Sequence, residues 1–370
     1  MHRLSIAALL LLPLTAALAQ GVNPAPRDYW KSCTIGKRDR GYTARIQGRY
    51  SVTEGSQALP TWLLRDDNGA NDDYNTRRIR LGYFDELQDD LLYFVQVRRD
   101  WGANEFEIHD LYLSWNRPGF GNLVLGQSMV PFGRQYLTSD IQLPLGERPL
   151  AETLLVPDRA IGLLLYNHRA TDRLGWYAGV YPGKGKNDWS TGSAIMAAAR
   201  VEYLVAPNLN IGLQWACHPD TATSTFQRFL SRNGSAYGLQ PLYAAGQVDE
   251  TAYGVDVLYR NGPTSIWGGT TTRKADGGAV SVTANAWYLE AGHYIPFQGQ
   301  DDKLELVLGY QDFDPNTAVT DQLDARWLAF GVNYHVEACK RQWRLNYTIR
   351  DEGADDVANN TLMLEYDHQF

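Results

Sequence analysis

Arginine recurs at even spacings in several stretches of the sequence, as in the pairs Arg45 and Arg49, and Arg78 and Arg80. Side chains two or four residues apart on a β-strand point to the same face, so each stretch would present its guanidinium groups together. Guanidinium groups remain charged at physiological pH and offer a planar fork of donors to oxyanions. This pattern favours weak, charge-assisted binding of anions. The candidate residues are Arg45, Arg49, Arg78, Arg80, Arg98, Arg344 and Arg350.

The elements that would position these arginines alternate between apolar and polar residues. In the segment 42–52, Tyr42, Ile46 and Tyr50 fall on one face, and the arginines fall on the other. Similar segments, each of about nine to twelve residues, recur along the chain, and the last alternates as far as Phe370. That length is what a tilted strand needs to cross the core of a bilayer. The arginine faces would then look inward, and the apolar faces would look out to lipid.

The connections between these segments alternate between short and long. Short connections are predicted at 88–90, 117–121, 170–172, 206–208, 261–263, 297–302 and 338–341. Long connections are predicted at 54–75, 129–158, 183–193, 218–251, 274–283, 313–325 and 352–359, and only 102–105 is short on that side. The segments between them number sixteen, and an even number is typical of closed up-and-down barrels. The sequence therefore predicts an all-β, transmembrane, antiparallel barrel of 16 strands over 42–370.

A water-soluble β-sandwich would also show alternation, and it is the alternative to a membrane barrel. Sandwich strands are shorter, and their turns recur every 8–12 residues without a short and long side. A strand protein in hydrocarbon must close on itself, because every backbone N–H and C=O group needs a partner there. The strand lengths and the two classes of connection favour the barrel.

The N-terminal region has the features of an export signal. Residues 1–19 combine a basic start, an apolar run and an Ala-x-Ala cleavage site, which is typical of a signal peptide. Residues 20–41 are then predicted to be a periplasmic segment, and the barrel to be in a bacterial outer membrane. Cys33 and Cys339 are both expected on the periplasmic side and could form a disulfide. A free Cys33, or a bond from Cys33 to Cys217, remains the alternative.

Several kinds of chemistry lack a motif in this sequence. No G-x-S-x-G element predicts an activated nucleophile, and the cysteines lack metal-ligand spacing. The histidines are expected singly at strand ends or rims, where they are usually interfacial. No basic stripe is interleaved with aromatics, as a nucleic-acid surface would be. We therefore expect no enzyme, no cofactor, no metal site and no nucleic-acid partner.

Several segments resemble the phosphate-selective porin O and P family. They are RRIRLGYFDEL, LVLGQSMVPFGRQYLTSD through GERPL, PDRAIGLLLYN, FGVNYHV and RLNYTIRDE, together with the closing strand. The resemblance covers much of 42–168 and 326–370. It implies a 16-stranded outer-membrane barrel, commonly trimeric, whose third long loop folds into the lumen. By position, the constriction loop is 129–158.

The predicted constriction loop has its own chemistry. Its leucines suit packing better than free exposure to water, although an external loop packed on its neighbours or on a trimer partner is the alternative. Its candidate site residues, with the residue that follows it, are Arg134, Asp140, Glu147, Arg148, Glu152, Asp158 and Arg159. A partly acidic wall is expected opposite the arginines, from Asp256, Glu290 and Glu305.

The chain departs from the family in its lysines. It has seven, and none is predicted in mid-strand on an inward face. A lysine-based phosphate trap is therefore not evident. We expect a passive, water-filled channel for small hydrophilic solutes that prefers anions, possible solutes including phosphate and related oxyanions. A weakly selective porin, or a non-conducting surface or adhesive barrel acting through its long loops, is the alternative. The expected partners are outer-membrane lipid, lipopolysaccharide, the solutes and two further copies of the chain.

Overall fold

The computed structural model describes the parts of the chain that form the barrel wall and the long connection between two of its strands. The described residues are 35–37, 40–54, 72–88, 90–100, 105–117, 121–167, 173–183, 185–188, 191–221, 248–278, 281–296, 303–319, 324–336, 341–352 and 359–369. The predicted signal peptide, Cys33, Cys339 and Phe370 lie outside them.

Sixteen strands form the wall in this part of the chain, and a three-residue strand, β1, pairs with the first of them. The strands are β1 (Ile35–Lys37), β2 (Arg40–Thr53), β3 (Asp72–Gln88), β4 (Leu91–Asp100), β5 (Glu105–Arg117), β6 (Gly121–Met129), β7 (Arg159–Tyr166), β8 (Leu174–Gly183), β9 (Thr191–Ala206), β10 (Leu209–Thr221), β11 (Val248–Asn261), β12 (Thr264–Asp276), β13 (Ser281–Pro296), β14 (Lys303–Asp314), β15 (Ala325–Val336), β16 (Arg341–Glu352) and β17 (Thr361–Gln369).

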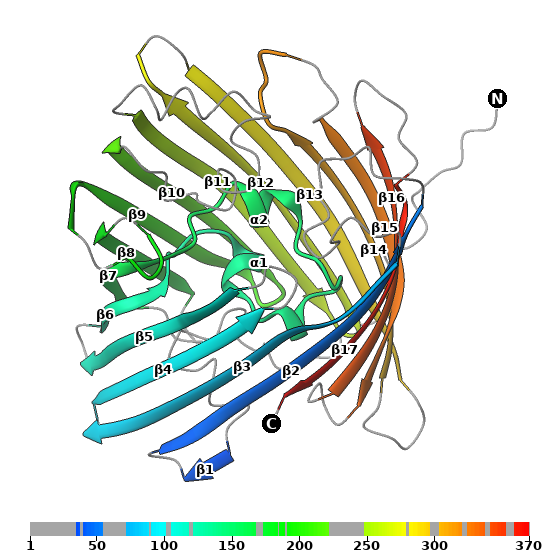
Figure 1. Cartoon of the computed structure of the whole chain (residues 1–370), viewed down its shortest axis with the longest axis horizontal. Helices are drawn as coiled ribbons and strands as arrows, with labels where there is room; N and C mark the ends of the chain where they lie inside the picture. Colours follow the sequence, from blue (N-terminus) through cyan, green and yellow to red (C-terminus); the bar gives the residue numbers. More distant parts are fainter. Residues whose placement is uncertain are drawn as a thin grey trace.

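The sheet closes into a barrel. Each strand from β2 to β17 pairs antiparallel with its neighbours in sequence, and β17 returns to β2 in a register that joins Thr361 to Thr53 and Gln369 to Arg45. Figure 1 shows the tilted strands and the β17–β2 seam. The predicted count of sixteen is confirmed. The alternation of short and long connections holds only in part, because β12 and β13 extend into the predicted long connection 274–283 and leave 277–280, which is shorter than the connection 297–302. Closure gives each strand from β2 to β17 a partner on both sides, which a strand protein requires in hydrocarbon.

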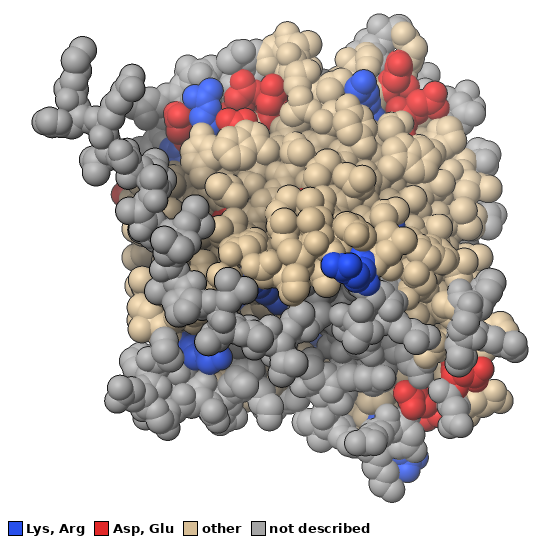
Figure 2. Space-filling model, turned by 180° about the vertical axis from the view of Figure 1, so that it is seen from behind, with Lys and Arg blue, Asp and Glu red and all other residues tan. Residues whose placement is uncertain are grey.

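The two faces of the wall differ as the alternation predicts. On β2, Tyr42 is 64% exposed and Ile46 is 39% exposed, whereas Arg45 and Arg49 are 5% and 4% exposed. Leucine is the commonest large hydrophobic residue at the outward positions, and most of the others are valine, isoleucine, tyrosine and tryptophan, which favour strands. Figure 2 shows the result from outside, as a broad uncharged band with charged residues gathered mainly beyond it. The apolar face therefore points outward, and the arginine face points inward.

The connection between β6 and β7 carries three short helices. They are α1 (Arg134–Leu137), the 3₁₀ helix η2 (Asp140–Gln142) and α2 (Leu150–Leu154). Figure 1 draws α1 and α2 within the outline of the ring of strands. No helix in the described residues is long and apolar enough to span a membrane.

Apolar side chains of segment 130–158 pack against inward residues of the wall. Leu150, Leu154 and Leu155 form one buried cluster with Trp267 and Trp327 on β12 and β15. A second cluster joins α1 and both ends of the segment to alanines of β9, β10 and β11. Its members from the segment are Val130, Phe132, Tyr136 and Val156. Burying these side chains stabilises the position of the segment against the wall.

Candidate functional site

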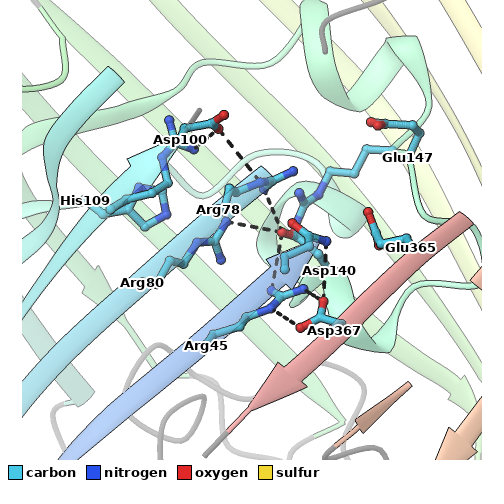
Figure 3. Close-up of polar contacts among 12 residues, drawn as sticks. Arg45, Arg78, Arg80, Asp100, His109, Asp140, Glu147, Glu365 and Asp367 are labelled. Carbon is cyan, nitrogen blue, oxygen red and sulfur yellow. Dashed lines mark hydrogen bonds and ion pairs between the residues drawn. The ribbon is translucent and has the colours of Figure 1, made fainter. Parts of the chain in front are cut away.

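Four arginines converge on the carboxylate of Asp140 in η2. The guanidinium groups of Arg78 and Arg80, on β3, lie 2.9 and 3.2 Å from Asp140 Oδ2, and Nη1 of Arg45, on β2, lies 3.4 Å from it. Arg148, in segment 130–158, forms an ion pair with Oδ1. Figure 3 shows the three wall arginines directed toward Asp140, with Asp367 beside Arg45. The sequence predicted these residues individually, and the fold brings them together.

The arginines determine the charge state of Asp140. Burial by itself raises the pKa of this carboxyl, but the positive charges of Arg148, Arg80, Arg78 and Arg45 outweigh it and hold the pKa well below its usual range. Asp140 is therefore ionised throughout the neutral range. Its carboxylate anchors the middle of segment 130–158 to β2 and β3.

A second group of ion pairs follows the seam of the barrel. Arg49 on β2 donates from Nε and Nη2 to Glu365 Oε2 on β17, at 3.2 and 2.7 Å, and from Nη1 to Glu147. Arg344 on β16 donates to Glu365 Oε1 at 3.0 Å and to the backbone oxygen of Asp140 at 2.6 Å. Arg45 donates to Asp367 on β17 at 2.8 Å. The acids of β17 thus interrupt the row of arginines.

The neighbouring wall contains charged residues that the sequence reasoning missed. Arg98 Nε lies 2.7 Å from Glu107 Oε1 on β5, and Arg98 Nη1 lies 3.9 Å from Asp100. His109 Nδ1 lies 3.1 Å from the same Glu107 oxygen. The alternation of β4 places Arg98 and Asp100 on one face and could have indicated Asp100. The position of Glu107 depends on a register irregularity between β4 and β5, which has no sequence signal.

A lysine from another loop reaches this wall. Lys186, between β8 and β9, pairs with Glu107, and its Nζ lies 3.7 Å from Asp158 at the end of segment 130–158. Tyr136 in α1 donates to Asp158 at 2.6 Å. The segment is followed by Arg159, whose Nε donates to Asp110 at 2.9 Å. No strand periodicity applies to Lys186, so no sequence pattern indicates this position for it.

Arg350 lies apart from the Asp140 cluster. It donates to the backbone oxygen of Asn359 at 2.9 Å and to Thr361 Oγ1 at 2.6 Å. Its Cζ lies over the Trp327 ring, 4.7 Å from the ring centroid. These contacts place it at the long-loop end of β16. The predicted row of seven arginines thus has six members near Asp140 and its neighbours and one nearer the mouth.

The wall on the opposite side of the ring is mixed in charge. Arg134 in α1 donates to Asp256 Oδ1 on β11 and to Asn210 Oδ1 on β10, both at 2.6 Å. Arg200 on β9 also donates to Asp256, at 2.6 and 2.9 Å, and to Glu202 at 2.6 Å. The expected acidic wall therefore contains arginines as well. Arg200 was missed, although the period-two pattern of β9 places it on the inward face.

The other two predicted acids of this wall are also bonded. Glu290 on β13 accepts from Gln135 Nε2 at 2.8 Å. Glu305 on β14 accepts from Asn333 Nδ2 at 2.9 Å and lies 2.9 Å from His335 Nε2. Asn333 also donates to the backbone oxygen of Pro144 at 2.6 Å. These acids contribute to holding the segment.

Glu152 in α2 joins the two helices of the segment to β13. It accepts from the Tyr136 backbone N–H at 3.2 Å and from Tyr288 Oη at 3.0 Å. Burial raises the pKa of Glu152, the charge of Asp256 raises it further, and the hydrogen bonds from Tyr136 and Tyr288 oppose the shift. Gly133 leaves room for this carboxyl: its φ is +75°, and an added Cβ would lie 2.0 Å from Glu152 Oε2. A side chain at position 133 would therefore displace Glu152.

Backbone groups complete the attachment of the segment around the ring. Gly146 N–H donates to Asn346 Oδ1 on β16 at 3.1 Å, and Leu150 N–H donates to Gln311 Oε1 on β14 at 2.6 Å. Gly133 N–H donates to Gln214 Oε1 on β10 at 3.2 Å. With the ion pairs of Asp140, these bonds join segment 130–158 to strands on opposite sides of the barrel.

The inward charges divide into two sides. On the side of β2 to β7, β16 and β17, with Lys186 and the residues of segment 130–158 that contact it, basic residues slightly outnumber acids; the residues are Arg45, Arg49, Arg78, Arg80, Arg98, Arg148, Arg159, Lys186, Arg344, Asp100, Glu107, Asp110, Asp140, Glu147, Asp158, Glu365 and Asp367. On the side of β9 to β14, acids outnumber arginines; the residues are Arg134, Arg200, Arg273, Glu152, Glu202, Glu250, Asp256, Glu290 and Glu305.

The expectation of interfacial histidines is wrong for three of them. His109, His218 and His335 are 1%, 2% and 2% exposed on inward positions of β5, β10 and β15. Period two does not distinguish an inward imidazole from an interfacial one, because histidine has both polar and apolar character. Among the described residues, no group of three or more His, Cys, Asp or Glu side chains could hold a metal ion. Cys217 is a free thiol, half-buried on an outward position of β10.

Comparison with known families gives one match over most of the chain. The model of the phosphate-selective porin O and P family matches residues 63–368. No curated protein matches the sequence significantly.

Solved structures of bacterial outer-membrane proteins share the fold. The loop L8 deletion mutant of OmpT of Vibrio cholerae superimposes with a TM-score of 0.61 at 12% identity, over 90% of this chain and 99% of that one. The anion-selective porin from Comamonas acidovorans gives 0.59 at 15% identity, over 90% and 99%. The outer membrane channel DcaP of Acinetobacter baumannii gives 0.58 at 11% identity, over 91% and 100%. At these identities the likeness shows the fold alone.

Proposed function

Because the chain belongs to the phosphate-selective porin O and P family, and is thus a porin of the bacterial outer membrane, we propose that it is a passive channel that prefers anions. Its solutes would be small and hydrophilic, with phosphate and related oxyanions among the candidates. The observation that carries the proposal is the convergence of Arg45, Arg78, Arg80 and Arg148 on one carboxylate of segment 130–158.

The preference for anions follows from the arrangement of charge. A guanidinium cluster that outnumbers its local acid gives a positive potential where water passes, and an acidic opposite side adds a field across the channel. An anion exchanges part of its hydration for hydrogen bonds to arginine, and binds weakly enough to leave. Screening beyond about 8 Å in physiological salt confines this effect to the narrow region. The Comamonas acidovorans protein that shares this fold is an anion-selective porin, which agrees with the proposal.

Segment 130–158 is proposed to be the constriction. Its bonds to β2 and β3 on one side, and to β10, β11 and β13 on the other, are those expected of a loop folded across the lumen. Its side chains that keep access to water include Gln142, Glu147 and Arg148. These residues, with the wall arginines, would determine which solutes pass.

Reversal potentials across a planar bilayer with unequal KCl concentrations test the proposal. The wild-type channel should give the sign of anion preference. Replacing Arg78 and Arg80 together by alanine should lower the anion-to-cation permeability ratio about two- to fourfold, since a unit charge at about 8 Å in water contributes about 0.5 kcal/mol and screening by salt reduces this to about 0.2 kcal/mol. Arg350→Ala is the matched control, because Arg350 lies nearer the mouth. Cation preference in the wild type would contradict the proposal.

Two further outcomes of the same measurement correspond to the alternatives. A ratio near one would identify a weakly selective porin, which the ion pairing of the arginines would explain. A folded protein without conductance would identify a surface or adhesive barrel acting through its long loops. Family and fold are those of a channel, and we propose no catalytic role.

The assembly and the N-terminal region complete the proposal. We propose a homotrimer, because a solved form of the Vibrio cholerae protein is a trimer. Chemical cross-linking of the detergent-extracted protein tests this. We further propose that residues 1–19 are removed on export, and that Cys33 and Cys339 form a disulfide beneath the barrel. Mass spectrometry of the mature protein without reduction tests both.

A further inference from the structure

One acid in the arginine cluster differs from the others in its exposure. The Glu147 side chain is 43% exposed, whereas those of Asp140, Glu365 and Asp367 are 4%, 0% and 0% exposed. All four form ion pairs with inward arginines. The three buried acids are fixed parts of the wall and the segment. Glu147 alone among these four has its carboxylate at the edge of the water-accessible space.

The partner of Glu147 is held from its other side. Arg49 donates from Nε and Nη2 to Glu365 Oε2, while Nη1 faces Glu147. The Arg49 side chain is only 4% exposed, so Glu147 covers the part of the guanidinium that faces segment 130–158. If Glu147 moved away, Arg49 would stay in place, because Glu365 would still hold it.

The residue next to Glu147 is also fixed. Arg148 donates from Nε to the backbone oxygen of Gln135 at 2.8 Å and from Nη2 to that of Thr138 at 2.7 Å, and it pairs with Asp140. The backbone at this point is therefore held, whereas 43% of the Glu147 side chain is exposed to water. Glu147 is the exposed partner of this pair, and Glu365 keeps Arg49 paired when Glu147 leaves, so another anion can take its place at Arg49 Nη1.

We propose that the Glu147 carboxylate occupies a subsite for small oxyanions on Arg49, and that a passing phosphate or carboxylate solute displaces it. Glu147 is then a tethered competitor that lowers the affinity of the constriction for oxyanions. It keeps binding weak and release fast, which a conducting channel needs. This inference rests on the proposed function, because it assumes that solutes reach segment 130–158.

Block of the chloride current by inorganic phosphate tests this subsite. Phosphate is titrated at constant ionic strength, and the half-blocking concentration is compared between the wild type and Glu147→Gln. Removal of the competing charge should lower that concentration about two- to fivefold. The matched control is Glu54→Gln, which makes the same charge change on an exposed residue bonded to Tyr347 and Asn360.

The outcomes separate this role from a merely structural one. An unchanged half-blocking concentration in Glu147→Gln, or an equal shift in Glu54→Gln, would overturn the inference. A change in chloride conductance without a change in phosphate block would show that Glu147 only fastens the segment, and would also overturn it. If Glu147→Gln does not fold, Glu147→Asp keeps the charge with a shorter reach and should shift the block in the same direction by a smaller factor.

Failure of the proposed function gives a different signature. Cation preference in the wild type would refute the anion channel, yet a phosphate shift in Glu147→Gln would still support the subsite. For a non-conducting protein, line broadening of phosphate in phosphorus NMR measures binding directly. Stronger broadening with Glu147→Gln than with Glu54→Gln supports the subsite, and equal broadening refutes it.

Discussion

At the scale of single residues, most of the inward arginines are fixed in ion pairs with acids of the wall or of segment 130–158. Arg98 and Arg344 are 1% and 0% exposed and are held by acids of the wall or segment. A buried charge is tolerated only when it is paired and hydrogen-bonded. The selectivity of the channel would therefore depend on the field of these fixed charges and on the few charged groups that keep access to water.

Asp140 is the acid on which most of these contacts depend. Asp140→Asn would leave four guanidinium groups around a neutral amide, and loss of one partner of a buried pair costs about 3 to 5 kcal/mol. We expect a lower thermal unfolding midpoint and a larger single-channel conductance, because segment 130–158 loses its attachment to β2 and β3. Thermal scans and conductance histograms check this. Wild-type values for both would show that the remaining bonds suffice.

The depressed pKa of Asp140 predicts the response of the wild type to acid. A carboxyl whose pKa is lower in the folded than in the unfolded state contributes stability above its ordinary pKa of about 4. That contribution is lost only as the pH falls through the depressed value. Between about pH 7 and pH 5, the attachment by Asp140 should thus be unchanged. If the wild type at pH 5 showed the conductance of Asp140→Asn, this attachment would have been lost, and the prediction would be contradicted.

At the scale of elements, segment 130–158 folds as short helices joined by buried contacts. Glu152 in α2 accepts from the α1 backbone and from Tyr288, and it depends on Gly133 for space. Helices of four or five residues are not stable alone, so the wall and these contacts must hold them. The conformation of the segment is therefore a property of the closed barrel.

The raised pKa of Glu152 gives a test of that dependence. A carboxyl whose pKa is higher in the folded state contributes stability below its unfolded pKa of about 4.3, and this is lost as the pH rises through the folded pKa. Glu152→Gln keeps the size and hydrogen-bonding capacity without the charge. The unfolding midpoint of Glu152→Gln minus that of the wild type should therefore rise between about pH 4 and pH 8.

Thermal scans of both proteins across that range measure the difference. Glu54→Gln, at an exposed position, is the control and should show no such trend. A difference that does not vary with pH would show that Glu152 titrates alike in the folded and unfolded states.

At the scale of the whole molecule, a closed wall with two unlike faces separates lipid from the inner charges. Leu364 lies 41% exposed on the outward face in the middle of β17, and the adjacent Glu365 is buried inside. The β17–β2 seam joins the two ends of the wall, so a defect here affects closure.

A charge on the lipid face of that seam should destabilise the barrel according to its depth. Leu364→Arg would place a cation near the bilayer midplane, at a cost of roughly 2 to 4 kcal/mol. Leu362→Arg, nearer the end of β17, should cost roughly 0 to 1 kcal/mol. Urea unfolding in lipid vesicles measures both. If the two substitutions lowered the free energy of unfolding equally, the bilayer core would not coincide with the uncharged band of Figure 2.

The sequence by itself determined the wall of this protein. Period-two alternation and connection length are local signals, so they were sufficient to predict sixteen strands, the outward face of Tyr42 and Ile46, and the inward face of Arg45 and Arg78. Each of these features depends on neighbours in the same strand or the next one. The family resemblance indicated the same architecture and singled out 129–158.

Only the tertiary structure decided which charges meet. Asp140 is 95 residues from Arg45 in sequence and Arg134 is 122 residues from Asp256, and the closed ring and the path of segment 130–158 bring them into contact. Lys186 reaches Glu107 from a loop without periodicity, and Glu107 faces inward across an irregular register. Charge pairing depends on distance in space, and alternation along a strand specifies only the face on which a charge lies.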